Sequence, residues 1–212
     1  MIEINNLTKK FDKTVSLDSV NLTFKKGNSI ALMGANGAGK TTLVRSILGY
    51  YHPTKGSILV DGLNPITNRT DVLKSISFVP QLPPPIKLSI KELIYFVCRS
   101  SNIEKDKIYH YANKMKLDIN SNINKSFFKL SGGMKQKLLI AISLAKDNSI
   151  VIYDEPTANL DPSARDDFYQ LIQESKNEKL SLFVTHRVEE VEELINRKIY
   201  MDLGKVVSDE SI

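Results

Sequence analysis

A glycine-rich segment near the start of the chain ends in a lysine and a threonine at a fixed spacing. It reads Gly34-Ala35-Asn36-Gly37-Ala38-Gly39-Lys40-Thr41, which matches the order of a loop that binds nucleotide phosphates. Glycines let backbone N–H groups turn inward, and a helix that begins at the loop directs the positive end of its dipole at phosphate. Lys40 can reach the β and γ phosphates, and the Thr41 hydroxyl can ligate Mg²⁺. We therefore predict a nucleotide site formed by these residues and Thr42.

Two carboxylates, Asp154 and Glu155, directly follow the apolar run Ile150-Val151-Ile152-Tyr153. Folds with parallel sheets bind their ligands at this end of a strand. Asp154 is predicted to hold Mg²⁺, directly or through water, and Glu155 to orient and deprotonate the attacking water. Taken alone, such residues are a solvated turn. Beside a phosphate loop they complete a site for metal and nucleotide, because in-line attack needs one group on the metal and another on the nucleophile.

The apolar patterns around these motifs predict a mostly parallel sheet covered by helices. Compact apolar runs alternate with helical periodicity, which gives strands at 29–33, 150–153 and 180–184 and helices at 41–48, 132–145 and 162–175. This alternation is typical of α/β proteins. Shorter pieces broken by Gly and Pro, at 1–7, 20–24 and 58–60, predict a separate small antiparallel sheet.

A helical lobe is predicted as an insertion in this core. The connector Leu82-Pro83-Pro84-Pro85 cannot be helical, and a helix-rich segment follows it over 89–124. Ser89 and Glu92 have the spacing of a capping box, which would open an amphipathic helix through Val97. We expect one domain, 1–212, with the lobe at about 82–135.

Composition narrows the class of protein. The chain has 212 residues, of which 42% are hydrophobic and 25% charged, as in a globular domain. Its net charge of +5 is scattered along the sequence, so no nucleic-acid partner is expected. The single Cys98, in an apolar stretch, is predicted to be buried in a protein of the reducing cytoplasm. The longest apolar run, 138–145, is far shorter than the ~20 residues that span a bilayer. The N-terminus has no secretion signal, so we expect a chain that is neither secreted nor membrane-spanning by itself.

The segment Leu130-Ser131-Gly132-Gly133-Met134-Lys135-Gln136 resembles the signature motif of the ATP-binding cassette (ABC) family. In physical terms, Ser131, Gly132 and Gly133 open a helix and offer a hydroxyl, backbone donors and a positive dipole end, which makes a second anion site. The resemblance implies a RecA-like phosphate-loop core of α/β class with an antiparallel β subdomain and an inserted helical subdomain. It also implies a head-to-tail homodimer, in which the signature of one subunit closes in trans over the ATP held by the other.

Smaller motifs follow in family order. Gln81 resembles the glutamine that contacts Mg²⁺ and the water, Ala158-Asn159-Leu160-Asp161 the loop that crosses the dimer interface, and His186 the histidine at the γ phosphate. Phe11 resembles the aromatic residue that stacks on adenine, with Val15 nearby. Alone, each has a plainer explanation: a strand-end phenylalanine, a surface amide or a helix cap. As an ordered set they favour the family.

Three residues depart from the common family pattern. Met134 and Lys137 stand where most members have Gln and Arg, and Phe11 where most have Tyr. Phe keeps the stacking face, and the two changes near the signature leave Ser131 and Gly133 intact. Glu155 is present, so a hydrolysing site is expected.

The resemblance implies an ATPase subunit with Glu155, His186 and Gln81 as catalytic residues and with ATP and Mg²⁺ bound. Such a subunit would drive a separate transmembrane permease from the inner face of the cell membrane, with the permease contacting 83–90. The chain ends soon after Gly204-Lys205-Val206-Val207, which favours a simple export-type system. The alternative from another class is an ABC-type ATPase of a soluble cofactor-assembly or repair complex. A nucleotide sensor without turnover is disfavoured by Glu155 and His186.

Overall fold

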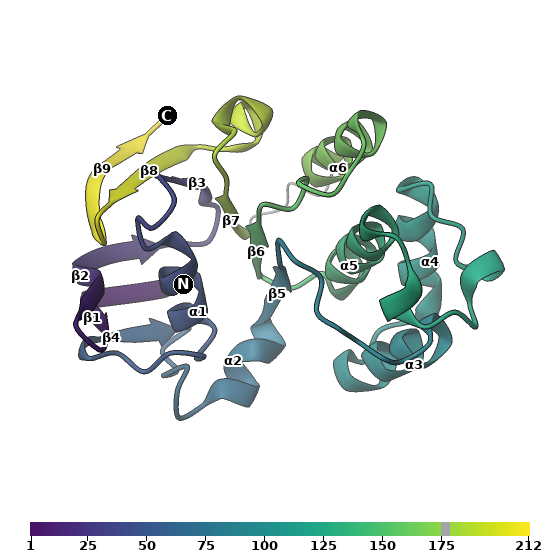
Figure 1. Cartoon of the computed structure of the whole chain (residues 1–212), viewed down its shortest axis with the longest axis horizontal. Helices are drawn as coiled ribbons and strands as arrows, with labels where there is room; N and C mark the ends of the chain where they lie inside the picture. Colours follow the sequence, from purple (N-terminus) through teal and green to yellow (C-terminus); the bar gives the residue numbers. More distant parts are fainter. Residues whose placement is uncertain (175–178) are drawn as a thin grey trace. The chain divides into compact units, whose positions relative to one another are not determined.

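The structure is a computed structural model that describes residues 1–174 and 179–212. The described chain divides into two compact units (Figure 1). Unit 1 contains residues 1–76, 149–154 and 179–212, and unit 2 contains residues 77–148 and 155–174. The chain therefore crosses between the units near Ile76, at 148–149 and directly between Asp154 and Glu155.

Unit 1 contains the small antiparallel sheet that the sequence predicts. Its strands run in the order β2-β1-β4, with bounds Ile2–Phe11 (β1), Thr14–Phe24 (β2) and Lys55–Val60 (β4). Both pairs are antiparallel. The strands extend beyond the predicted 1–7 and 20–24 through segments with many exposed polar residues. Backbone pairing rather than burial holds these segments in the sheet, so apolar pattern alone does not reveal them.

The larger sheet of unit 1 is mostly parallel, as predicted. Its strands follow the order β6-β7-β3-β8-β9, with bounds Ile150–Asp154 (β6), Leu180–Val184 (β7), Ser29–Met33 (β3), Arg197–Asp202 (β8) and Lys205–Ser211 (β9). Only β9 runs antiparallel to its neighbour among these. Every residue of β6 is buried, and the rings of Tyr153 and Phe183 stack with centroids 5.1 Å apart. Burial on both faces explains why these strands are continuous apolar runs.

The described part of unit 1 also contains the helices α1 and α2 and two short 3₁₀ helices, Val188–Glu190 and Glu192–Leu194. Helix α1 (Lys40–Ile47) follows β3 and confirms the predicted helix at 41–48. Helix α2 (Arg69–Ser75) leads into strand β5 (Ile76–Val79), where the chain passes into unit 2. The sequence pattern did not predict α2, β5, β8 or β9. Only Val72 of α2 is buried, and β9 has no buried residue, so α2 and β9 lack an apolar face that would identify them. Strand β5 is only four residues long, and the buried residues of β8 are only Ile199 and Met201, so neither gives a long apolar run.

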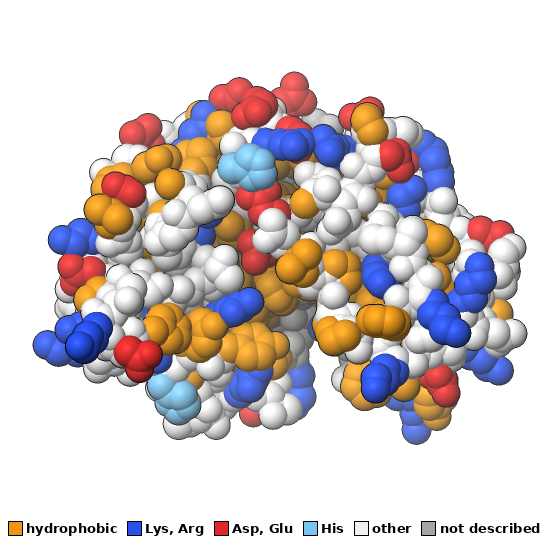
Figure 2. Space-filling view, in the orientation of Figure 1, with side chains coloured by type: hydrophobic (Ala, Val, Ile, Leu, Met, Phe, Trp, Pro, Cys, Tyr) orange, Lys and Arg blue, Asp and Glu red, His pale blue; other side chains and the backbone are white. Residues whose placement is uncertain are grey.

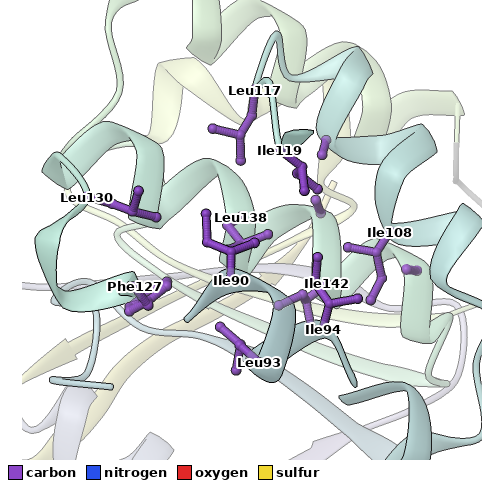
Figure 3. Packing of buried hydrophobic residues seen from close by; sticks show 13 residues of the cluster. Ile90, Leu93, Ile94, Ile108, Leu117, Ile119, Phe127, Leu130, Leu138 and Ile142 are labelled. Carbon is purple, nitrogen blue, oxygen red and sulfur yellow. The ribbon is translucent and has the colours of Figure 1, made fainter. Parts of the chain in front are cut away.

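Unit 2 is helical, and it includes the helices predicted at 132–145 and 162–175, which the sequence pattern placed over the sheet and not in the lobe. Its helices are α3 (Ile90–Ser101), α4 (Lys105–Lys114), α5 (Gly132–Lys146) and α6 (Pro162–Glu174), with short 3₁₀ turns at Asn120–Asn122 and Phe127–Lys129. The predicted last residue of α6, Ser175, lies outside the described residues. Figure 3 shows how side chains from α3, α4 and α5 meet in one apolar core, among them Ile94, Ile108 and Leu138.

The predicted capping box is confirmed at the start of α3. The Ser89 hydroxyl accepts a hydrogen bond from the Glu92 N–H at 3.2 Å, and the Glu92 carboxylate accepts one from the Ser89 N–H at 2.8 Å. A further hydrogen bond from the Ser89 hydroxyl is the main reason that the pKa of Glu92 lies below its usual value.

The prediction that Cys98 is buried holds only in part. Its thiol is partly buried and lines a groove of about 630 Å³ in unit 2, beside Tyr95 and Tyr109. Partial desolvation raises the pKa of this thiol. Cys98 lies on a side of α3 that faces this groove. The apolar residues beside it in the sequence therefore do not enclose it.

Within the described residues, no helix combines the length and apolarity that crossing a bilayer requires. Figure 2 shows Lys and Arg side chains at many separate places on the face drawn, interspersed with acidic and apolar side chains.

Candidate nucleotide-binding site

The loop between β3 and α1 adopts a backbone that its glycines make possible. Gly34, Gly37 and Gly39 have φ values of 141°, 85° and 102°, in the region that L side chains rarely adopt. A Cβ on Gly34 would lie 2.1 Å from the Met201 carbonyl oxygen, and one on Gly39 would lie 2.6 Å from that of Ser16. At these two positions both conformation and space require glycine.

The charge of Lys40 lies over this loop. Its Nζ donates hydrogen bonds to the carbonyl oxygens of Gly34 at 2.6 Å and Ala35 at 3.0 Å. Gly204, which lies outside the loop, donates its N–H to the carbonyl oxygen of Ala38 within the loop at 3.1 Å. Glycine backbone, an ammonium group and the N-terminus of α1 therefore converge, which is the arrangement that fits a chain of phosphates.

The two threonines after Lys40 face different surroundings. Thr42 Oγ1 lies 2.7 Å from Ser16 Oγ on β2, and the Thr42 carbonyl accepts from the Ser46 hydroxyl at 2.8 Å. Thr41 is exposed. The structure thus ties Thr42 to β2 and leaves Thr41 as the threonine suited to a metal ion. Sequence reasoning missed Ser16, because no local pattern links it to the loop.

Unit 1 brings the ends of three parallel strands to one edge. Val184 is in register with both Leu32 of β3 and Asp154 of β6, so β7 lies between these two strands. With strands about 4.8 Å apart, Asp154 lies about 10 Å across the sheet from β3. Asp154 is 8% exposed. His186 leaves β7 at the same edge, in a turn where the Thr185 hydroxyl accepts from the Arg187 N–H at 2.9 Å.

An aromatic pair lies on the antiparallel sheet of unit 1. The Phe11 ring, 39% exposed, meets Tyr51 edge-on with centroids 5.0 Å apart. Lys9 Nζ lies 4.9 Å from the Phe11 centroid, and Arg45 donates to the Tyr51 hydroxyl at 2.9 Å. Val15, also exposed, pairs with Lys10 across the hairpin. A supported, exposed ring is suited to stacking on a base. Tyr51 was missed because it has no periodic or motif signal.

The second predicted anion site lies in unit 2, at the start of α5. The Ser131 hydroxyl caps the helix by accepting from the Met134 N–H at 3.2 Å, and Ser131 and Gly132 are exposed. Met134 packs against the core of unit 2, and Lys137 Nζ lies 3.9 Å from an Asp161 carboxylate oxygen. The two departures from the family pattern therefore leave the capped helix start unchanged.

Gln81 and Glu155 also belong to unit 2. Gln81 is exposed, and its carbonyl accepts from the Asn159 side chain at 3.0 Å. Glu155 has a φ of 46° and opens a turn in which the Ala158 N–H donates to its carbonyl at 3.2 Å. This left-handed conformation costs a residue such as glutamate about 1–2 kcal/mol, and strain of this kind collects at functional sites.

The loop glycines give a matched pair of substitutions. Gly34→Ala is expected to lower the free energy of unfolding by more than about 2 kcal/mol, because it combines positive φ with a clash against backbone. Gly37→Ala also places a side chain at positive φ, at 85°, but has no atom within 4 Å of its Cβ, so a loss of about 1 kcal/mol is expected. Urea unfolding of both variants checks this. Equal losses would contradict the geometry described for Gly34.

These features define a phosphate-loop nucleotide-binding protein. The family model described as ABC transporter matches residues 17–158. The ATP-binding protein EcfA2 of the energy-coupling factor transporter of Clostridium perfringens is 32% identical over 95% of this chain and 74% of its own length. The lantibiotic transport ATP-binding protein SrtF of Streptococcus pyogenes is 34% identical over 98% and 89%. The chain belongs to the ABC transporter family, as an ATP-binding ATPase subunit.

Other similar proteins differ from this chain in length, and their sequence identities and TM-scores vary. The chain spans only 14% of the human ATP-binding cassette sub-family A member 10, at 31% identity. A solved dimeric structure of a bacterial ABC transporter cassette superposes with a TM-score of 0.85, at 26% identity over all of this chain and 98% of the other. The structure of an ATP-binding subunit of an ABC transporter gives 0.89 at 22% identity, over 100% and 90%, which shows the fold alone. The predicted α/β fold and family are confirmed.

Proposed function

We propose that this chain hydrolyses ATP as a head-to-tail dimer and thereby drives a separate membrane permease. The observation that carries this is the presence of two helix N-termini suited to phosphate in one chain: α1 with Lys40, and α5 capped by Ser131. A dimer uses both, since the exposed start of α5 is presented to a second copy. The three signature residues Ser131, Gly132 and Gly133 then bind the triphosphate held by the partner's phosphate loop.

In the reaction, water attacks the γ phosphorus and the bond to the β–γ bridging oxygen breaks. Lys40 neutralises oxygens of the β and γ phosphates. Glu155 accepts a proton from the water, and His186 donates toward the γ phosphate. Thr41, Asp154 and Gln81 are the residues that would hold Mg²⁺, which supplies charge neutralisation at the phosphates when bound. Phe11 and Val15 contact the adenine.

Loss of the γ phosphate removes the group that holds the two subunits together. Closure with ATP and opening after hydrolysis are then a switch of the type in which a terminal phosphate orders two elements. We propose further that 1–212 is a single nucleotide-binding domain, with the lobe at about 82–135 as the part that transmits this movement.

The helical lobe carries apolar side chains suited to a membrane partner. Leu82, Tyr95 and Phe96 are 76%, 67% and 60% exposed, and Leu88 is 39% exposed. Large apolar side chains left exposed on two segments adjoining in the sequence, 82–89 and α3, are suited to a protein interface. The contact predicted at 83–90 therefore extends along α3 to Tyr95 and Phe96. Docking there places the chain on the inner face of the cell membrane. EcfA2 and SrtF are both named as transport components, which supports this over a soluble assembly complex.

The proposed partner is tested by recovery of tagged protein from detergent-solubilised membranes. A membrane protein is expected to copurify with the unmodified chain, and Tyr95→Ser with Phe96→Ser is expected to lower its recovery on the order of tenfold or more. Phosphate release without the partner should stay unchanged in this variant. Tyr200→Ser, at an exposed tyrosine of β8, is the control. Recovery of soluble partners alone would favour the cofactor-assembly or repair alternative.

A further inference from the structure

Two side-chain amides hold the backbone on either side of the Gln81 side chain. The Nε2 of Gln136, in α5, donates to the Pro80 carbonyl at 3.2 Å. The Nδ2 of Asn159, in the loop before α6, donates to the Gln81 carbonyl at 3.0 Å. All four residues belong to unit 2. Two consecutive carbonyls are thus fixed by groups from two different segments.

Holding the Pro80 carbonyl with Gln136 lowers the stability of the fold. It is fully buried, and its Oε1 has no hydrogen-bond partner among the residues that the structure describes. The Pro80 carbonyl oxygen can only accept, so the NH₂ end of the amide must face it, and the amide cannot be reversed to satisfy its own oxygen. A buried, half-satisfied amide is less stable than an apolar side chain of similar size. Packing therefore does not account for glutamine at this position.

Asn159 connects the same backbone to the start of α5. Its Oδ1 lies 3.7 Å from the position of a Cβ on Gly132, and its carbonyl oxygen lies 3.1 Å from that of a Cβ on Gly133. A side chain at Gly133 would press on the Asn159 backbone, whereas one at Gly132 would make only ordinary contact, so Gly133 gives this loop room. The loop is also tied to α5 through Lys137 and Asp161, 3.9 Å apart.

We propose that Gln136 and Asn159 are positioning residues that couple Gln81 to the phosphate-binding end of α5. A shift of α5 as Ser131 takes up phosphate from the second copy moves the Pro80 and Gln81 carbonyls with it. The Gln81 side chain is thereby placed for Mg²⁺ and water only when the trans site is filled. This inference rests on the proposed function, and it assigns a role to two residues outside the groups that contact ATP.

The test uses substitutions that remove the donors and preserve shape. Gln136→Met deletes the bond to Pro80 together with the unpaired oxygen, and Asn159→Asp deletes the bond to Gln81. Each is expected to lower kcat about 10- to 100-fold with the KM for ATP within about twofold, because a small misplacement of a catalytic group has an effect of this size. The Mg²⁺ concentration for half-maximal rate should rise. Gln136→Met should unfold no earlier than the unmodified chain. Asn113→Asp, at an exposed asparagine of α4, is the control.

A double-mutant cycle separates positioning from a general effect on structure. In a Gln81→Ala background, Gln136→Met should change kcat by less than about twofold, since its target is already gone. An unchanged kcat in the single variants, or a full additional loss in the Gln81→Ala background, would overturn the proposal.

If the unmodified chain released no phosphate, the proposed function would fail and the coupling would be tested by hydrogen exchange. Exchange at the amides of Gln81 and Leu82 should then be faster in both variants than in the unmodified chain. Equal protection would show that the two amides do not hold this segment.

Discussion

Glu155→Gln is expected to lower phosphate release by about 10³-fold while the affinity for ATP stays within a few-fold of that of the unmodified chain. The amide has the shape of the carboxylate but cannot accept the proton of the attacking water, and loss of a general base has an effect of 10²–10⁴-fold. The positive φ of 46° at position 155 has about the same conformational cost for glutamate and for glutamine. Steady-state phosphate release and calorimetric titration with ATP measure the two quantities.

The same substitution should trap the dimer that ATP closes. Because opening depends on loss of the γ phosphate, the Glu155→Gln chain with ATP and Mg²⁺ should elute as a dimer where the unmodified chain elutes mostly as a monomer. Glu210→Gln, in β9 at the exposed end of the larger sheet, is the control and should behave as the unmodified chain in both assays. Equal rates for Glu155→Gln and the unmodified chain would remove Glu155 from the role of base.

Local sequence signals predicted the parts of the site whose backbone depends on local chemistry. The phosphate loop needs positive φ at Gly34 and Gly39, and the sequence has glycine there. The start of α5 needs a capping hydroxyl, which Ser131 provides. In both cases a short stretch of chain contains the whole physical requirement, so spacing alone was enough to place it.

The missed parts are side-chain contacts between residues far apart in the sequence. Ser16 meets Thr42, Phe11 meets Tyr51, and Gln136 meets the Pro80 carbonyl. No periodicity reports such pairs, because each depends on how separate elements pack. The support that Gly204, between β8 and β9, gives the phosphate loop was missed for the same reason, because its backbone hydrogen bond to Ala38 forms only once the sheet is assembled.

A mixture of two inactive variants is expected to recover about a quarter of the activity of the unmodified protein. Lys40→Ala removes the ammonium that lies over the phosphate loop, and Ser131→Arg fills the exposed start of α5; each alone should lose at least about 100-fold in phosphate release. Random exchange makes about half of the dimers mixed. Each mixed dimer has one site in which Lys40 of one chain meets Ser131 of the other, so one site in four is intact.

The matched control replaces Ser131→Arg in the mixture with the double variant Lys40→Ala/Ser131→Arg. Lys40→Ala mixed with Lys40→Ala/Ser131→Arg has no chain that supplies Lys40, so no recovery is expected. Subunit exchange is verified separately with two fluorescent labels at Cys98, the single cysteine of the chain. Recovery in the first mixture and none in the second is possible only if two copies build each site, because a site complete within one chain cannot be repaired by a partner with a different defect. If mixtures with verified subunit exchange are as inactive as the single variants, Ser131 has no role in trans.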